Sequence, residues 1–457
     1  MSDALLPADE RTRTIARELY ESVADAPILS PHGHVDPRLL LADRAFADPA
    51  ELFIRSDHYV TRLLHAAGIP LDALGLGAPV DPRGVWRLLC EHWHLYAGTA
   101  SGSWLAYELA ELFGIREPLD AATAGATFDR ISAVLREPGF RPRALFRRFG
   151  IEVLATTDDP LDDLEAHRVL AASDLGGRVI PTFRPDAYLD PEGAAFPERS
   201  QALLDATGRP GTLAGYLDAL AERRAFFVSR GAVSADHGVV EPFTVELGSE
   251  DAERLFDGAR RRTLDPAEAR LLRGHLLLEM ARMSTEDGLV MTIHPGVRRD
   301  HHLPTFERFG PDTGHDIPVR VEYTDNLRPL LHRFGTAPGF HLVLFTIDET
   351  VLSREVAPLA GFYPSVFAGA PWWFLDAPDA IQRARSAVTE TAGFYRGSGF
   401  IDDTRAFLSI PARHDTSRRL DAAFLARLVA EERVPMVTAR RIARDLVDAI
   451  PRTAFKL

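Results

Sequence analysis

Two histidines at the end of a short apolar run form the first candidate site in the sequence. His32 and His34 lie in residues 27–35 and are separated by a single glycine. If this run is a strand, residues i and i+2 project to the same side, so both imidazoles can reach one metal ion. A lone His-x-His pair is weak evidence, because a hydrogen-bonded pair at a strand end has the same spacing. The pair therefore needs further ligands from elsewhere in the chain.

Two later runs supply candidate ligands. His294 lies in residues 288–296, and Asp402 and Asp403 lie in residues 400–407. Each of these runs is expected to be a strand that carries its polar residues toward the site. Imidazole nitrogens and carboxylate oxygens are ligands that zinc accepts. The sequence therefore predicts one divalent metal ion, zinc by its ligand types, held by His32, His34, His294 and Asp403.

The elements that must position these residues are strands alternating with helices. Helix-like stretches, such as residues 325–334 and 378–395, separate most of the apolar runs. Eightfold alternation is typical of the (β/α)8 TIM-type barrel, an α/β fold whose catalytic groups lie at the C-terminal ends of the strands. We therefore expect residues 1–457 to form one such barrel domain. The eight predicted strands are residues 27–35, 151–159, 178–186, 231–238, 288–296, 341–348, 365–374 and 400–407.

The interval between the first two predicted strands is much longer than the others. More than a hundred residues separate the first run from the second, and they read as several helices with glycine and proline between them. We expect residues 36–150 to be a helical insertion after strand one, which could close over the mouth of the barrel.

Composition excludes several other classes of protein. The chain has 457 residues, 46% of them hydrophobic, which is enough apolar material for a large core. Its 52 basic and 66 acidic residues give a net charge of −14, which disfavours nucleic acid and anionic membranes as partners. The only lysine is Lys456, so a Schiff-base lysine, a P-loop lysine and a lysine-bridged metal pair are excluded from the interior. A small-molecule substrate is the expected partner.

Cysteine usage and hydropathy bear on the compartment. Cys90 is the single cysteine, which excludes a disulfide framework. No run of about 18 uninterrupted apolar residues could span a bilayer, and the first twenty residues lack the apolar stretch of a signal peptide. We expect a cytoplasmic protein that can form a homo-oligomer.

Many short motifs occur in one order along nearly the whole chain, including the helical insertion. They are HGH at 32–34, DHYVTR at 57–62, ATTDDPLDDL at 155–164, TFRPD at 182–186, ADHG at 235–238, HPGVRR at 294–299, PWWF at 371–374 and GFIDDTRAFLSIPARHD at 399–415. In these motifs the sequence resembles the uronate (glucuronate) isomerases of the amidohydrolase superfamily.

This resemblance implies isomerisation of D-glucuronate to D-fructuronate and of D-galacturonate to D-tagaturonate. Aldose–ketose isomerisation through an enediol needs groups that move protons between C2 and C1, and others that hold negative charge on oxygen. Asp403 aligns with the family's strand-eight aspartate and keeps the spacing to Arg405, whereas Asp402 occupies a position that is usually neutral. Tyr59 is the expected second acid/base group, and His58 either caps a helix or hydrogen-bonds substrate hydroxyls.

The substrate carboxylate needs a cationic partner, and the guanidinium fork of arginine suits it. Arg184, Arg299 and Arg405 are expected at or just past strand ends and match family positions. Asp236 is expected to bind a substrate hydroxyl or to orient His294. Trp372 and Trp373 are also expected at the site, where one of them stacks on the sugar.

Two other functions compete with this interpretation. The first is a one-metal hydrolase or deaminase of the same superfamily, acting on a small carboxylate substrate with metal-activated water. The second is a sugar-acid binding protein without catalysis, which is disfavoured because every expected acid/base position is present. A turnover assay separates the binding protein from the enzymes.

Overall fold

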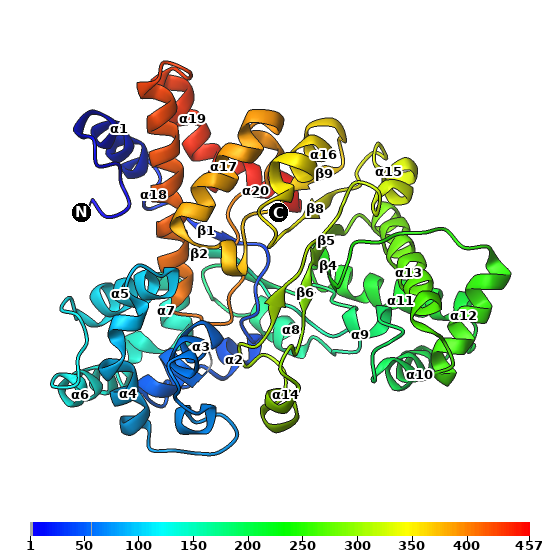
Figure 1. Ribbon diagram of the computed structural model, residues 1–457, viewed down its shortest axis with the longest axis horizontal. Helices are drawn as coiled ribbons and strands as arrows, with labels where there is room; N and C mark the ends of the chain where they lie inside the picture. The colour runs from blue at the N-terminus through cyan, green and yellow to red at the C-terminus, as the bar shows by residue number, and fades with distance from the viewer. Residues whose placement is uncertain (1–2, 56) are drawn as a thin grey trace.

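A computed structural model describes residues 3–55 and 57–457, so Met1, Ser2 and Ser56 lie outside the described part of the chain. Figure 1 shows strands near the middle of the molecule with helices around them. The strands are β1 (Ile28–Ser30), β2 (Ile151–Ala155), β3 (Arg178–Ile180), β4 (Ser234–Val239), β5 (Val290–Pro295), β6 (Val297–Arg298), β7 (Ile317–Pro318), β8 (Leu342–Leu344) and β9 (Val366–Ala368).

Helices follow or separate most of the strands, as the sequence predicted. Residues 325–334 contain α15, and residues 378–395 contain α17. The helices outside residues 36–150 are α1 (Glu10–Glu21), α8 (Glu165–Ala171), α9 (Asp186–Leu189), α10 (Phe196–Thr207), α11 (Leu213–Ser229), α12 (Ser249–Arg261), α13 (Pro266–Asp287), α14 (Leu303–Phe309), α15 (Arg328–Phe334), α16 (Ala357–Phe362), α17 (Pro378–Ala392), α18 (Ser409–Ala430), α19 (Met436–Val447) and α20 (Ala449–Phe455).

The parallel strands follow one another around a barrel. Strands β1, β2 and β3 pair in that order, and so do β4, β5, β8 and β9. A parallel bridge from Phe183, beyond β3, to Ala235 of β4 joins the two groups, and Ala368 bridges to Gly397 at the far edge. The ring closes where the His34 amide donates to the Thr404 carbonyl at 2.9 Å. The chain therefore has the predicted α/β barrel fold.

The main difference from the predicted fold is at the eighth strand. Residues 400–407 contain no regular strand, and the pairing to β9 is a single bridge at Gly397. Gly399 has φ 75° and Asp403 has φ 41°, and left-handed residues interrupt the extended conformation that a ladder needs. The barrel therefore closes through an irregular segment. The structure also adds β6 and β7, a short antiparallel pair that the sequence did not predict.

Alternation along each strand divides the core into two environments. In β5, Met291 packs against the surrounding helices, whereas Val290 packs inside the barrel with Val343 of β8 and Phe367 of β9. The amino end of this interior is filled by the C-terminal residues of the chain, because Phe455 is fully buried in the same cluster. The opposite, carboxyl end is left for polar side chains.

Residues 36–150 hold a group of helices whose apolar cluster is continuous with residues of the barrel, such as Ile28 of β1 and Ile151 of β2. Several of these helices begin with an aspartate or threonine that accepts from a first-turn amide, such as Asp57 before α3 and Thr99 before α5. In Figure 1 they gather at the lower left, near one end of the long helix α18. The helices are α2 (Pro37–Ala42), α3 (His58–Ala66), α4 (Pro82–Glu91), α5 (Ala100–Phe113), α6 (Ala124–Leu135) and α7 (Pro142–Arg148).

The outer helices carry no membrane-spanning candidate. No helix in the described part of the chain is both long and apolar enough to cross a bilayer.

Candidate active site

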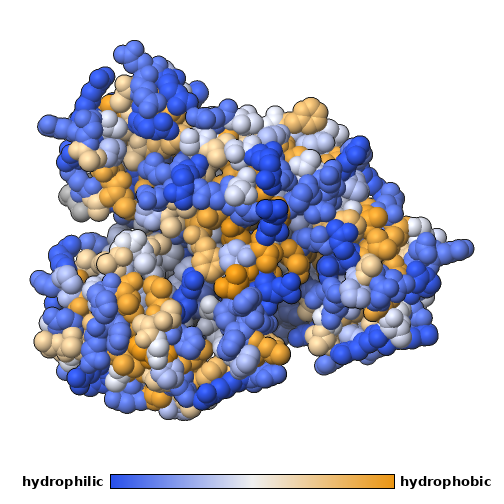
Figure 2. Space-filling model, in the orientation of Figure 1, coloured by the Kyte–Doolittle hydropathy of each residue, from blue (hydrophilic) through white to orange (hydrophobic). Residues whose placement is uncertain are grey.

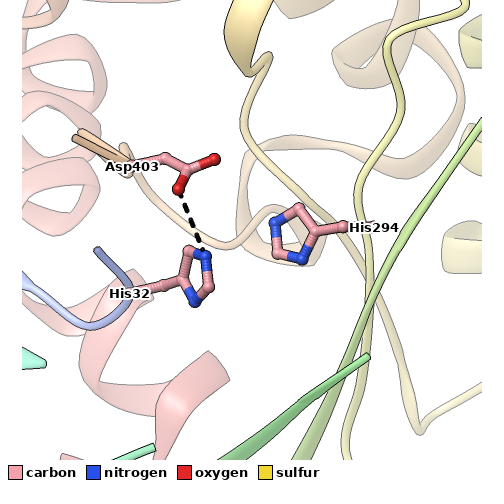
Figure 3. Close-up of side chains that lie close together, drawn as sticks. All are labelled: His32, His294 and Asp403. Atoms are coloured by element: carbon pink, nitrogen blue, oxygen red, sulfur yellow. Dashed lines mark ion pairs between the residues drawn. The ribbon is translucent and has the colours of Figure 1, made fainter. Parts of the chain in front are cut away.

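A cluster of two imidazoles and one carboxylate lies at the carboxyl end of the barrel. His32, His294 and Asp403 each offer a ligand atom, and these atoms lie within 4.8 Å of one another. Figure 3 shows the three side chains converging from separate segments of the chain. His34 lies outside this group of three, but its Nε2 is 3.0 Å from Asp403 Oδ1, and His32 Nε2 is 3.3 Å from the same oxygen. This donor set could bind a metal ion.

The two histidines reach one carboxylate although neither lies in a strand. Strand β1 ends at Ser30, and His32 and His34 follow in an irregular segment. The hydrogen bond from His34 to Thr404 holds that segment beside Asp403. Asp403 has left-handed backbone, so its two-residue spacing to Arg405 does not place the two side chains on one face of a strand. Main-chain contacts at the closure of the barrel assemble the cluster instead.

Neighbouring groups fix the orientation of the imidazoles. His294 Nδ1 lies 2.6 Å from Asp236 Oδ1, which also accepts from the Thr292 hydroxyl at 2.5 Å. His34 Nδ1 lies 2.7 Å from the Thr157 hydroxyl. Carboxylate or hydroxyl contacts of this kind set the tautomer and ring orientation of metal-binding histidines. His294 Nε2 is buried and has no hydrogen-bond partner among the described residues, so it is available as a ligand.

Electrostatics favour an ionised Asp403 carboxylate beside a neutral His34 ring. At His32, burial disfavours the charged ring, but Asp236 and Asp403 outweigh burial and raise its pKa. Burial opposes the charge on Asp403, but His32 and His34 hold the pKa of its carboxyl well below its usual range. Burial lowers the pKa of His34 to about 4, so this ring is neutral at pH 7. Carboxylate and neutral imidazole are the forms that bind metal ions.

A cavity of about 1010 Å³ opens beside this cluster. The space-filling view is hollowed near its centre, between the helices of residues 36–150 and those on the α9–α13 side (Figure 2). His32 and Asp236 do not line the cavity, because they are buried behind it with exposed fractions of 1% and 0%. The predicted residues that line it are His34, His58, Tyr59, Arg184, His294, Arg299, Trp372, Trp373, Asp403 and Arg405.

His58 and Tyr59 bring the inserted helices into this cavity. They form the first turn of α3, where the Asp57 side chain accepts from the Tyr59 amide at 2.8 Å. Burial raises the pKa of Tyr59 above its ordinary value, so the phenol is protonated at neutral pH. Burial and the charge of Arg405 lower the pKa of His58 to about 4. Both ring nitrogens of His58 lack hydrogen-bond partners among the described residues, so this neutral ring is free to bind a ligand.

Each of the three predicted cavity arginines already contacts a carboxylate, at different distances. Arg184 Nε donates to Asp186 at 2.9 Å. Arg299 Nη1 donates to Asp316 at 2.8 Å. The longest of these contacts joins Arg405 Nη1 to Asp312 Oδ2, at 3.4 Å. Of the three arginines, Arg405 therefore has the weakest contact with a carboxylate of the protein.

The two tryptophans have different neighbours. Trp372 lies edge-on to His294, with ring centroids 4.8 Å apart. Trp373 lies edge-on to His58 at 5.7 Å, and the Arg299 guanidinium is 5.1 Å from its ring. Both indole nitrogens are buried without hydrogen-bond partners among the described residues. Trp373 is therefore the tryptophan grouped with the polar cavity residues.

Sequence reasoning missed two neighbours of the site. Phe345 stacks on the His294 ring at 4.0 Å, and its place at the end of an apolar run was an available signal. Asp312, the partner of Arg405, lies between α14 and β7, where no spacing rule pointed to the cavity.

The fold and site together define a barrel enzyme with a histidine–aspartate centre at the carboxyl end of its strands. A family model described as glucuronate isomerase matches residues 10–452. A uronate isomerase from Corynebacterium efficiens is 50% identical, over 100% of this chain and 98% of that protein. The chain belongs to the glucuronate isomerase family, a family of aldose–ketose isomerases.

Solved structures agree with this assignment. Glucuronate isomerase from Caulobacter crescentus superposes with a TM-score of 0.98 at 46% identity, covering 100% of this chain and 96% of that one. Uronate isomerase from Thermotoga maritima superposes with a TM-score of 0.94 at 26% identity, covering 100% and 99%. Family membership therefore favours the isomerase over the hydrolase and the binding protein.

Proposed function

We propose that this uronate isomerase interconverts D-glucuronate with D-fructuronate and D-galacturonate with D-tagaturonate, using Asp403 and Tyr59 as its proton-transfer groups. The observation that carries the proposal is a cavity whose lining includes the ionised Asp403 carboxylate, the protonated Tyr59 phenol and the three predicted arginines. These are the groups that an enediol reaction on a sugar carboxylate needs.

The two proton-transfer groups differ in protonation state. The Asp403 carboxylate is the base that accepts the C2 proton and returns it to C1. The Tyr59 phenol donates a proton to the O1 oxygen as negative charge develops there, and takes one from O2. The sum of these transfers converts the aldehyde to the ketone without a net change in protons. His58, neutral and unpaired, holds a substrate hydroxyl by hydrogen bonding.

Recognition of the carboxylate falls to the arginines. Arg405 has the longest contact to its present partner, so its guanidinium is the one best able to pair with the uronate carboxylate. Arg299 and Arg184 are positioned to bind further substrate oxygens. Trp373 provides the apolar wall against the sugar, and Trp372 supports His294.

A divalent ion, zinc by its ligand types, would be held by His32, His34, His294 and Asp403. The unpaired Nε2 of His294 and the Asp236 contact behind it support this fit. A bound cation would polarise a substrate oxygen as a Lewis acid. Asp236 then acts by orienting His294, since its carboxylate is fully buried. The cytoplasmic location and a homo-oligomeric state stay predictions.

Proton NMR in deuterated water tests the proposal. Purified protein is incubated first with glucuronate and then with galacturonate, with Asp403→Asn as the matched control. Ketose signals are expected with wild-type protein and absent with the control, and any deuterium at C1 would measure how far the proton carried by Asp403 exchanges with solvent before it reaches C1. Failure to form ketose from either uronate would overturn the proposed reaction, and full activity of Asp403→Asn would overturn the role of Asp403.

A further inference from the structure

Arg413 is a fully buried arginine on α18 that lies outside the residues lining the cavity. Its Nη1 donates to Asp376 Oδ2 at 2.7 Å and to the main-chain carbonyl of Asp402 at 3.2 Å. Its Nε donates to the Ser409 hydroxyl at 3.2 Å. One guanidinium therefore ties the loop after β9 to the main chain directly before Asp403.

The same guanidinium contacts two aromatic rings from the inserted helices. Arg413 Cζ lies 3.6 Å from the ring centroid of Trp104 on α5 and 5.2 Å from that of Tyr59 on α3. The two rings lie edge to face, with centroids 5.6 Å apart. A cation near an aromatic face is attracted to the ring, most strongly when it is desolvated. Arg413 therefore touches the ring of Tyr59 as well as the segment that carries Asp403.

A second buried arginine shows that burial alone does not create such a link. Arg224 on α11 is also fully buried, and it donates to Asp287 at 2.6 Å and to Ser284 at 2.8 Å on α13. These contacts join two outer helices and reach no cavity residue. A buried ion pair is weak evidence for stability, so the contacts of Arg413 call for a different explanation.

The charge of Arg413 also acts on the proposed proton-transfer group. Burial raises the pKa of the Tyr59 phenol, and Arg413 is the largest influence in the opposite direction. Burial raises the pKa of Asp376 to about 7, and Arg413 again acts against that increase. The guanidinium is therefore the main positive charge among these groups.

We propose that Arg413 is a positioning residue for the isomerisation, which holds the Tyr59 ring and the main chain at Asp402 in one arrangement so that Tyr59 and Asp403 face the same substrate. It contacts no substrate itself. This inference rests on the proton-transfer roles proposed above for Tyr59 and Asp403. It also makes docking of α3 and α5 on α18 a condition for a complete site.

Steady-state kinetics of Arg413→Met and Arg413→Lys test the inference, with Arg224→Met and Arg224→Lys as matched controls. Arg413→Met is expected to lower kcat by about tenfold to a hundredfold, the usual range for a residue that orients a site group, with KM within about twofold. Arg413→Lys keeps the charge but loses the fork, so it recovers part of kcat. The Arg224 variants are expected to lower the melting temperature and leave kcat unchanged.

A double-mutant cycle with Tyr59→Phe tests whether Arg413 affects kcat through Tyr59. Residues that act through one another have non-additive effects, so Arg413→Met should reduce the residual kcat of Tyr59→Phe by a clearly smaller factor than it reduces wild-type kcat. The loss that remains in the Tyr59→Phe background reports the contact with the main chain at Asp402. If Arg413→Met does not fold, Arg413→Lys and Asp376→Asn take its place in the same cycle.

Three results would overturn the inference. The first is wild-type kcat in Arg413→Met. The second is a full, multiplicative loss in the Tyr59→Phe background, which would mean that Arg413 does not act through Tyr59. The third is full activity of Tyr59→Phe alone, which would overturn the proposed role of Tyr59 and this inference with it.

Discussion

The polar groups at the two ends of the barrel differ in whether they have hydrogen-bond partners. At the carboxyl end, His294 Nε2 and Asp402 Oδ1 are buried without hydrogen-bond partners among the described residues. At the amino end, Lys456 Nζ donates to the carbonyls of Gly288 and Gly339 at 2.7 and 2.5 Å.

This difference indicates that the carboxyl end of the barrel binds a ligand, whereas the amino end stabilises the fold. An unpaired buried polar group costs roughly 1–3 kcal/mol, so several of them in one place indicate a bound partner. The amino end instead satisfies its strand-end carbonyls and packs Phe455 into the interior. Substitutions at the two ends should therefore affect different properties of the protein.

The largest effect is expected from Asp403→Asn at the carboxyl end. Loss of the proposed base and metal ligand should lower kcat/KM by about a thousandfold and reduce bound metal. The melting temperature should change little, because the amide has the same shape. Metal analysis and kinetics check this, and wild-type metal content with wild-type activity would contradict the proposed centre.

Phe455→Ala at the amino end should affect stability alone. Removing a fully buried aromatic ring typically costs about 3–5 kcal/mol in the free energy of unfolding. Phe362→Ala is the control, since Phe362 is 74% exposed and should lose little. Urea unfolding measures both variants, and a loss of kcat in folded Phe455→Ala would remove the distinction between the two ends.

Arg405→Lys should separate charge from geometry at the carboxyl end. Lysine keeps the positive charge but cannot form the two-pronged contact with a carboxylate, so kcat/KM should fall about a hundredfold. Arg308→Lys, at an exposed ion pair with Asp72, is the control. Activity of Arg405→Lys within a few-fold of wild type would shift carboxylate binding to Arg184 or Arg299.

Asp236→Asn should weaken metal binding by about tenfold to a hundredfold, the usual result of removing a carboxylate that orients a metal-binding histidine. Competition with a chelator measures the affinity. Unchanged affinity would mean that Asp236 does not act through His294.

The smallest effect is expected from Lys456→Met. The substitution removes two hydrogen bonds of a partly exposed amine at the amino end, each worth about 0.5–1.5 kcal/mol of unfolding free energy. Urea unfolding measures the loss, and kcat should be unchanged. A larger fall in kcat than in stability would show that the two ends are coupled.

The barrel and much of the cavity could be predicted because they depend on local patterns. Seven of the eight predicted runs overlap a regular strand, since short apolar runs mark buried parallel strands directly. His32, His294 and Asp403 were expected together because strand ends meet at one edge of a parallel barrel. The closing segment was predicted as a strand because its composition does not show the left-handed turn at Asp403.

Contacts between distant segments could not be predicted. Asp312 reaches Arg405 from a loop, and no periodic pattern relates the two positions. Arg413 meets Trp104 only because α18 and α5 pack together, and nothing in either segment shows that contact. Such pairs become visible only when the helices are placed in space.

The single lysine also gives the molecule an unusual chemical property. Lys456 carries the only side-chain amine in the chain, and that amine is engaged by two carbonyls at the base of the barrel. An acylating reagent can modify this amine when both hydrogen bonds are broken and the amine is unprotonated. The mass gain at this one position would therefore report, without any engineered label, how often the C-terminal residues release the carbonyls of Gly288 and Gly339.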